Sequence, residues 1–428
     1  MSDFKSEGMD VPNGEATTLI RVGIASAPHL DVRRLADGSY EIADVTIGKQ
    51  FHWERRECQH FSGEMKIVSR DGLETAINTL PLEDYLVSVI SSEMKATSHP
   101  ELLKAHAVIS RSWALARILE RRQKESDAAE NQEDAFSPSN SESQTRNGVE
   151  EIIRWYDADG HEGYDVCADD HCQRYQGIDR IRPEAEEAVR ATAGEVLMHD
   201  GVLCDARFSK CCGGAFEVFS SCWAPHDLPY LRPGRDLVPE SPYPDLHDET
   251  MAQEWIESRP DAFCANPDRE SLEMVLNQYD LERFTPGVND SYRWEELLSA
   301  ATLREILMLK SGIDFGEIKA LRALKRGTSA RIHLLEIEGT KHTVRVGKEL
   351  EIRRWLSRSH LPSSAFVARM DTQGNWHFRG AGWGHGVGLC QIGAAMMALR
   401  GYNYRQILAH YFPGTVAERL HCDCPIIH

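Results

Sequence analysis

The chain has 428 residues, which is long enough for two or three domains. Hydrophobic residues make up 41% and charged residues 27%, a balance typical of a folded globular protein rather than a disordered one. The formal net charge of −19 argues against binding to a nucleic-acid backbone, which requires clustered positive charge.

The N-terminal residues 1–17 are polar and acidic, and we expect them to be disordered. They contain no basic stretch leading into an apolar one, so no secretory signal is visible and the sequence by itself points to the cytoplasm. The longest uncharged run, 380–399, holds six glycines and is a poor candidate for a membrane span.

Residues 18–78 carry short runs of β-forming residues separated by turn signals such as Asp37-Gly38 and Asp71-Gly72. This pattern predicts an antiparallel sheet or a small barrel. From Pro81 onward the apolar period becomes helical, and it predicts one helix over 82–94. The sequence from Ser98 to Glu101 resembles a capping box that opens a second helix, running to about Arg122.

The remainder of the chain alternates between acidic stretches and short predicted elements. Residues 125–151 hold eight acidic residues against one basic residue, which predicts a solvated and mobile insertion. A short helix over 184–192, a second acidic stretch over 236–300, a β-rich return over 330–346 and a last helix over 391–399 follow. We therefore predict an α+β fold, with helices packed on mixed or antiparallel β structure.

Glu93 is the first candidate for chemistry. It lies beside Met94 at the end of an apolar helix stripe, where desolvation would raise the pKa of a carboxyl group and keep its proton available. A general acid that cleaves a glycosidic bond needs such a proton. The alternative interpretation is an ordinary solvated glutamate at a helix end.

A second candidate is a group of four metal-ligating residues within twelve positions, His161, Cys167, His171 and Cys172. Their types and number suit zinc. Because His171 and Cys172 are adjacent, a bend is needed for both to reach one ion, so the alternative is an irregular loop with incidental thiols. The chain has 11 cysteines, and an odd count in a long chain favours reduced thiols or metal ligands over a disulfide framework. We interpret Cys211/Cys212 and Cys422/Cys424 as bystanders rather than redox centres.

The third candidate is the segment from Gly380 to Gly388, in which every second residue is glycine. If it is extended, one face is bare backbone and the other presents Trp383, His385 and Val387. The spacing is not that of a dinucleotide-binding fingerprint, so a phosphate cradle is not expected. A Cys390 nucleophile with His385 as its base is a further alternative, although no third partner is identifiable.

Together these segments resemble the stage II sporulation protein D family, also called the amidase-enhancer family. The resemblance covers about 80–415, and we assign 79–428 to a catalytic domain of this type. The matching segments, in the family's order, are LPLEDYL at 80–86, SEM at 92–94, LKAHAVISRS at 103–112, CQRYQG at 172–177, CGG at 212–214, RGAGWGHGVGLCQIGA at 379–394 and ILAHYFPGT at 407–415.

The resemblance implies a peptidoglycan lytic transglycosylase that acts on glycan strands stripped of their peptide stems. In that interpretation Glu93 first protonates the leaving oxygen and then helps the 6-hydroxyl of the sugar to close a 1,6-anhydro ring. This chemistry needs no second carboxylate, unlike that of ordinary glycosidases.

The resemblance also implies roles for other residues. Some family members carry zinc in a His, Cys, His, Cys cluster, so the resemblance supports a structural zinc at His161, Cys167, His171 and Cys172. It places five residues in the glycan groove, although Arg111 could instead pair with an acidic neighbour and Tyr175 could belong to the core. The five are Arg111, Gln173, Tyr175, His385 and Gln391.

The chain also departs from the family pattern. Lys95 stands where the family commonly has proline, His106 where it has glutamine, and Cys212 and Cys390 where it often has serine. The substrate that the resemblance implies lies in the cell envelope, whereas no secretory signal is visible in the N-terminal residues. A non-catalytic peptidoglycan-binding module that enhances a cell-wall amidase is the alternative function.

Overall fold

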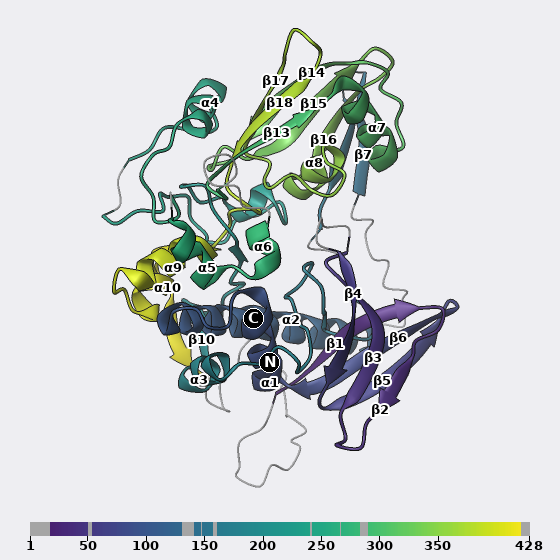
Figure 1. The fold of residues 1–428 in the computed structure, drawn as a ribbon, viewed down its shortest axis with the longest axis vertical. Coiled ribbons are helices and arrows are strands. Elements are labelled where there is room, and N and C mark those ends of the chain that lie inside the picture. The colour runs from purple at the N-terminus through teal and green to yellow at the C-terminus, as the bar shows by residue number, and fades with distance from the viewer. Residues whose placement is uncertain are drawn as a thin grey trace.

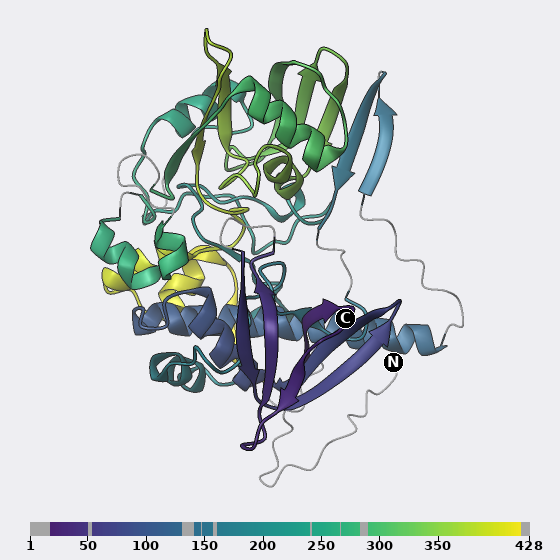
Figure 2. The same ribbon diagram turned by 45° about the vertical axis from the view of Figure 1, so that its right-hand side comes forward.

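The computed structural model describes residues 18–49, 54–130, 141–146, 148–156, 161–239, 242–265, 267–282 and 290–420. The expected disorder of 1–17 and the Cys422/Cys424 pair therefore lie outside the described residues. Figures 1 and 2 show two groups of elements, one around the N-terminal sheets and one around the sheets formed by residues after 290. Helices and loops from both halves of the chain join the two groups.

The N-terminal part forms two sheets, as the alternating pattern predicted. Strand order is β5-β6-β1-β9 in one sheet and β2-β3-β4 in the other, and every pairing is antiparallel except that of β9 with β1. Their bounds are β1 (Leu19–Ala27), β2 (Val32–Arg34), β3 (Tyr40–Ile47), β4 (Arg55–Phe61), β5 (Glu64–Arg70), β6 (Leu73–Pro81) and β9 (Val166–Cys167).

Helix α1 (Leu82–Glu93) follows β6 directly and ends at Glu93, and α2 (Pro100–Glu130) packs against it. The predicted capping box does not form. The Ser98 hydroxyl donates to the carbonyls of Lys95 and Met274, and the imidazole of His99 accepts from the backbone N–H of Glu101 instead. Because Pro100 starts the helix, Ser98 lies one position too early to cap it. Helix α2 also runs beyond the predicted end at Arg122.

The second group of elements holds a five-stranded and a three-stranded sheet. Strand order is β14-β15-β16-β8-β7 in the first and β13-β18-β17 in the second. Their bounds are β7 (Ser141–Arg146), β8 (Val149–Arg154), β13 (Arg293–Leu298), β14 (Ile318–Arg326), β15 (Ile332–Gly339), β16 (Thr343–Gly347), β17 (Phe366–Met370) and β18 (Trp376–Ala381), with α7 (Ala300–Ser311) and α8 (Glu349–Trp355) packed beside them. The acidic stretch 125–151 thus supplies the end of α2 and two paired strands, and its residues 131–140 and 147 lie outside the described ranges.

Short elements fill the space between these groups. They are α3 (Pro183–Ala191), β10 (Glu195–His199), β11 (Val202–Leu203), β12 (Phe208–Ser209), the 3₁₀ turn Phe219–Ser221, α4 (Glu249–Glu257), α5 (Arg269–Val275), α6 (Gln278–Glu282), β19 (Leu389–Cys390), α9 (Gln391–Leu399), α10 (Tyr404–Tyr411) and β20 (Val416–Arg419). The helix predicted over 391–399 is present as α9, but it is not the last one. Helix α10 follows it, opened by a capping box between Asn403 and Gln406.

One large core joins distant parts of the chain. It contains side chains of β1, α1 and α2 together with side chains of α9 and α10, while a second core lies between α7, α8 and the sheets around them. The α+β class predicted from the sequence is confirmed. None of the helices in the described ranges combines the length and the apolar character needed to cross a bilayer.

Candidate functional site

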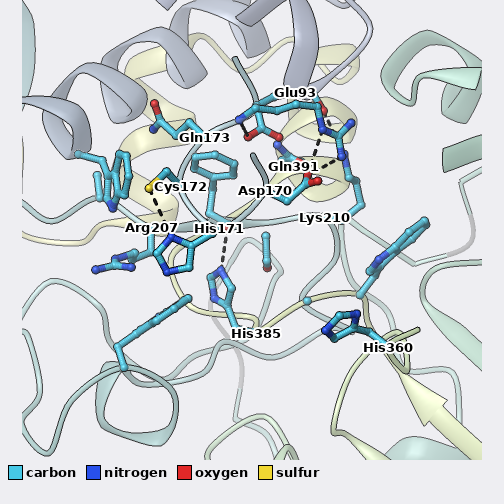
Figure 3. A pocket seen from close by; sticks show the side chains of 18 of the residues that line it. Glu93, Asp170, His171, Cys172, Gln173, Arg207, Lys210, His360, His385 and Gln391 are labelled. Carbon is cyan, nitrogen blue, oxygen red and sulfur yellow. Dashed lines mark hydrogen bonds and ion pairs between the residues drawn. The ribbon is translucent and has the colours of Figure 1, made fainter. Parts of the chain in front are cut away.

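A pocket lies where the end of α1 meets the loops on either side of β12 and β19. Glu93, Asp170 and Lys210 supply charge to its wall, and Trp113, Trp223 and Trp383 supply three indole rings. Figure 3 shows Glu93 and Lys210 on one side and His385 on the other. Residues from early and late parts of the chain thus face the same space.

Glu93 is buried, and one of its two carboxylate oxygens is held in place. Its Oε1 accepts a hydrogen bond of 2.8 Å from the backbone N–H of Arg174, and the residue is 7% exposed. Its Oε2 has no hydrogen-bond partner among the described residues. The carboxyl group is therefore fixed at one oxygen and can offer the other to a molecule in the pocket.

Lys210 fixes the end of α1 from the opposite side. Its Nζ donates to the backbone carbonyl of Glu93 at 3.1 Å and lies 3.0 Å from Asp280 Oδ2. A cation at the C-terminus of a helix also complements the helix dipole. Lys210 is thus positioned to hold Glu93 without touching its carboxylate.

A second carboxyl group, that of Asp170, lines the pocket. Burial raises its pKa to about 7, and the guanidinium of Arg174, which donates to its Oδ1 at 2.7 Å, opposes that rise. Asp170 lies within the segment that carries the four metal-ligating side chains, and Arg174 lies two residues beyond it. Asp170 and Lys210 are pocket residues that the sequence reasoning missed; their positions next to CQRYQG and CGG were the only signal.

The four predicted zinc ligands come together in the structure. One ligand atom from each of His161, Cys167, His171 and Cys172 lies within 4.8 Å of all the others. Cys167 belongs to β9, and a turn after it reverses the chain so that the adjacent His171 and Cys172 both face inward. His161 Nε2 and His171 Nδ1 lie 3.1 and 3.5 Å from the Cys172 sulfur.

These distances fit a tetrahedral metal site. Ligands at about 2.0–2.3 Å from zinc lie about 3.3–3.8 Å from one another. In addition, the second ring nitrogen of His171 contacts the Tyr156 carbonyl at 3.2 Å, the orienting contact that metal-bound histidines usually make. The four side chains therefore form a candidate metal centre directly before Gln173 and Arg174, the residues that reach the pocket and Glu93.

Three of the five predicted groove residues line the pocket, namely Gln173, His385 and Gln391. Both glutamines are 1% exposed, and each amide is already bonded: Gln173 accepts from Tyr85 and donates to Ser110, and Gln391 contacts His106 at 3.0 Å. They therefore shape the wall more than they offer free polar groups.

Arg111 and Tyr175 do not line this pocket. The Arg111 guanidinium is buried and bonds both oxygens of Glu83 at 2.7 Å, and it also reaches the carbonyl of Glu195. Tyr175 is 1% exposed, and its hydroxyl donates to Asn78. These are the ion-paired and core positions that the sequence left open as alternatives.

The Gly380–Gly388 segment is not the extended strand that its alternation suggested. Strand β18 ends at Ala381, and Gly382 and Gly386 have φ angles of 77° and 76°, which side chains larger than hydrogen rarely adopt. A Cβ atom at either position would lie within 2.7 Å of the Arg331 guanidinium. The bare backbone therefore accommodates a buried arginine of the protein itself.

The structure gives the Cys390/His385 dyad no support. His385 Nε2 lies 2.8 Å from the Phe208 carbonyl, and its Nδ1 accepts from the Val387 N–H, so both ring nitrogens are engaged. Burial lowers the pKa of His385 to about 3. The ring is neutral and has no free lone pair with which to activate a thiol.

Comparisons with known proteins match two parts of this chain to protein families. Residues 70–199, which include Glu93 and the four metal-ligating residues, match the family described as "Stage II sporulation protein". The resemblance predicted from the sequence is thus confirmed over these residues. Residues 217–388 match a second family, described only as a domain of unknown function.

Two curated proteins are similar to this chain. The "Amidase enhancer" of Bacillus subtilis (strain 168) is 24% identical over 240 residues, which cover 54% of this chain and 32% of that protein. An uncharacterised protein of Brachyspira hyodysenteriae is 23% identical over 355 residues, 83% of this chain and 71% of that one. The match thus spans about a third of the length of the Bacillus relative.

Proposed function

We propose that the protein is a peptidoglycan lytic transglycosylase with Glu93 as its acid and base. The single observation that carries this proposal is the setting of Glu93: a buried carboxyl group, fixed at Oε1, with Oε2 available on the wall of an open pocket. Glu93 lies in the part of the chain that matches the sporulation-protein family, whose name suggests a role in the cell wall. We therefore favour a glycan strand as the substrate.

The proposed reaction uses the two protonation states of one carboxyl group in turn. Protonated Glu93 gives its proton to the glycosidic oxygen as the bond to C1 of the muramic residue breaks, which leaves an oxocarbenium-like centre. The resulting carboxylate then takes the proton of the sugar's own 6-hydroxyl while that oxygen bonds to C1. The product is a 1,6-anhydro ring, and Glu93 regains its proton.

The remainder of the wall suits a carbohydrate. Trp113, Trp223 and Trp383 line the pocket with apolar surface that would contact the C–H groups of a sugar, and the Arg207 guanidinium covers one face of the Trp223 ring at 4.5 Å. The acids Asp170 and Asp280 are both engaged by cations, Arg174 and Lys210 respectively. This leaves Glu93 as the carboxyl group best placed to exchange a proton with the substrate.

We further propose that zinc occupies the four-residue site as a structural metal. Four protein ligands would leave no open position for a substrate or water. What His161, Cys167, His171 and Cys172 would do is fix the turn that presents the Arg174 N–H to Glu93.

The test is mass spectrometry of glycan strands without peptide stems, incubated with the wild-type protein, Glu93→Gln and Asp84→Asn. Asp84→Asn is the matched control because it removes one exposed carboxylate from the same helix, away from the pocket. We expect anhydro-muramic ends from the wild type and the control and none from Glu93→Gln. Intact strands with all three proteins would refute the proposal.

Products with reducing ends would also refute the proposal, because they would show hydrolysis, which ordinarily needs a second carboxyl group. Reducing ends that disappear in both Glu93→Gln and Asp170→Asn would indicate a glycosidase that uses the pair.

The name of the Bacillus relative supports a second candidate, a module that binds peptidoglycan and enhances a cell-wall amidase. In that case Glu93→Gln would leave strand binding and amidase stimulation unchanged. Measuring amidase activity with and without each variant separates the two functions, because only the enzyme requires the Glu93 carboxyl group.

A further inference from the structure

A second group of metal-ligating side chains lies in the interior, away from the His161 loop. Cys212, Asp236, Cys264 and Cys390 are all buried, and one ligand atom from each lies within 4.8 Å of the others. The Cys212 sulfur lies 3.5 Å from both the Cys264 sulfur and Asp236 Oδ2. The sequence reasoning treated Cys212 as a bystander, and the four residues are too far apart in the chain to form a recognisable motif.

The separations fit one tetrahedral ion. Sulfur ligands at about 2.3 Å from zinc lie about 3.8 Å apart, and a carboxylate oxygen at about 2.1 Å lies about 3.6 Å from such a sulfur. A disulfide would instead require about 2.05 Å between the two sulfurs. The 3.5 Å separations therefore suit ligands around a common centre and not a bonded pair.

The four side chains are also oriented as bound ligands are. The Cys390 sulfur accepts from the N–H groups of Cys212 and Gly393 at 3.2 and 3.4 Å, and the Cys212 sulfur accepts from Gly214 at 3.4 Å. Such N–H donors stabilise thiolates, and Cys390 also caps the N-terminus of α9, where a negative charge is favoured.

Asp236 is held as firmly as the cysteines. Its Oδ2 accepts from the Cys264 N–H at 3.1 Å, and its Oδ1 accepts from the Tyr411 hydroxyl at 2.8 Å. The close approach depends on Gly393, where a Cβ atom would lie 2.5 Å from Asp236 Oδ2. A ligand carboxylate needs partners of this kind on the oxygen that does not face the metal.

Two buried arginines supply the opposite charge. Arg331 donates to the carbonyls of Cys211 and Cys212, and Arg293 donates to that of Gly213, so both contact the loop that carries Cys212. Both are less than 10% exposed, and within the described parts of the chain neither has a carboxylate at salt-bridge distance. Buried cations need nearby negative charge. Three thiolates and a carboxylate around a divalent ion would carry a net charge of about −2 and would supply it.

We propose that Cys212, Asp236, Cys264 and Cys390 form a second zinc site with a structural role. Zinc binding would release the three thiol protons, because only thiolates ligate the ion. Asp236 and Cys264 come from the 217–388 segment, while Cys212 precedes that segment and Cys390 follows it. The ion would tie the segment at both of its ends to the base of α9, close to the pocket. Cys212 lies two residues after the pocket residue Lys210, and Cys390 lies directly before the pocket residue Gln391.

The experiment determines the number of zinc ions per chain by elemental mass spectrometry. It uses the full-length protein, purified under reducing conditions. We expect about two zinc ions in the wild type, one for each proposed site. Cys172→Ser, which removes a ligand of the His161 site, should retain about one, and so should Cys264→Ser. Cys204→Ser is the matched control, because it changes a buried cysteine outside both clusters and should retain about two.

The Cys172→Ser variant tests the proposal even if Cys264→Ser fails to fold. Retention of about one ion in Cys172→Ser supports the second site, and loss of all zinc overturns it. Replacing zinc with cobalt in Cys172→Ser should give an intense thiolate-to-cobalt absorption band from three sulfurs. A wild-type protein with a single zinc that is lost in Cys172→Ser, or an intact mass lighter by two hydrogens from a Cys212–Cys264 disulfide, would also overturn the proposal.

Discussion

Lys210 is the residue on which the position of the proposed acid most depends. It connects the C-terminal carbonyl of α1 to Asp280, which is 2% exposed at its side chain. Removing one of the cations that face a buried carboxylate is costly, because less of the buried negative charge is then compensated. Lys210 therefore affects both the stability of the protein and the geometry of Glu93.

We predict that Lys210→Met lowers the free energy of unfolding by about 3–5 kcal/mol, the usual effect of removing one partner of a buried ion pair. Glycan cleavage by the folded fraction should also fall, because the end of α1 loses its tether. Urea denaturation and initial rates of anhydro-sugar release measure the two effects.

The double variant Lys210→Met/Asp280→Asn is the control for charge. It should recover much of the lost stability, because the buried carboxylate is gone, but not the lost activity. Recovery of both would mean that Lys210 acts only through charge balance and does not position Glu93.

At the scale of elements, α1 and α2 are joined by the bidentate pair between Arg111 and Glu83. Lysine keeps the charge at position 111 but cannot form the two parallel hydrogen bonds or reach the carbonyl of Glu195 as well. We predict that Arg111→Lys lowers the melting temperature by several degrees. Its dissociation constant for glycan strands should remain that of the wild type. If Arg111→Lys bound glycan strands more weakly but kept its melting temperature, Arg111 would have to contact the substrate.

The His161 site is the other feature that positions Glu93. Removing zinc from the protein with a chelator should lower glycan cleavage severalfold, because the turn that presents the Arg174 N–H to Glu93 loses its anchor at the His161 site. Readding zinc should restore the rate in the wild type but not in Cys172→Ser. If the chelated protein, confirmed to be free of metal, cleaved glycan strands at an unchanged rate, the metal would not be needed to position Glu93.

Elements with a local signal were predictable, and those that depend on distant partners were not. The period of apolar residues located α1 and α9, and short alternating runs located the N-terminal sheets. Strand β7 and the start of β8 lie in an acidic stretch that was expected to be mobile, and strand-like sequence begins only at Ile152. They form by pairing with each other and with β16, whose sequence lies almost 200 residues later. The prediction of an extended segment over Gly380–Gly388 was wrong, because the alternating glycines provide left-handed turns around Arg331.

The candidate site divides in the same way. Glu93 and the four ligands of the His161 loop lie close together in the sequence or within a recognisable motif. Lys210, Trp113, Trp223 and the second cysteine cluster are assembled by tertiary packing, so the spacing of these residues along the sequence did not reveal them. The glycine pattern did single out Trp383, and the nearby CGG motif was the only signal for Lys210. Arg111 and Tyr175 occupy motif positions but serve packing, which a motif alone cannot distinguish from contact with substrate.

At the scale of the whole molecule, buried neutral histidines make stability depend on pH. Burial lowers the pKa of His106 and His385 to about 3 and that of His333 to about 4. Since the unfolded pKa is higher, near 6.5, the unfolded chain binds these protons first. Their contribution to stability is complete above about pH 6.5 and is lost as the pH falls toward 4.

We predict that the free energy of unfolding decreases between pH 6.5 and pH 4.5 by up to about 1.4 kcal/mol per pH unit for each of these histidines. His106→Gln should show a shallower decrease, because glutamine can still contact Gln391 but does not titrate. Urea denaturation at a series of pH values gives both slopes. Equal slopes for the two proteins would show that His106 carries a proton in the folded state.

The long separation between Glu93 and the opposite wall of its pocket has a consequence for synthesis in the cell. Gln391 follows Glu93 by about 300 residues, and ribosomes add about 5–20 residues per second, so the acid emerges roughly 15–60 s before Trp383 and Gln391. Lys210 emerges about 6–23 s after Glu93, but Trp383 and Gln391 are missing from the pocket wall until the end of that interval. A nascent or prematurely terminated chain would therefore carry the proton donor without a place to bind a sugar, and activity would begin only with the finished polypeptide.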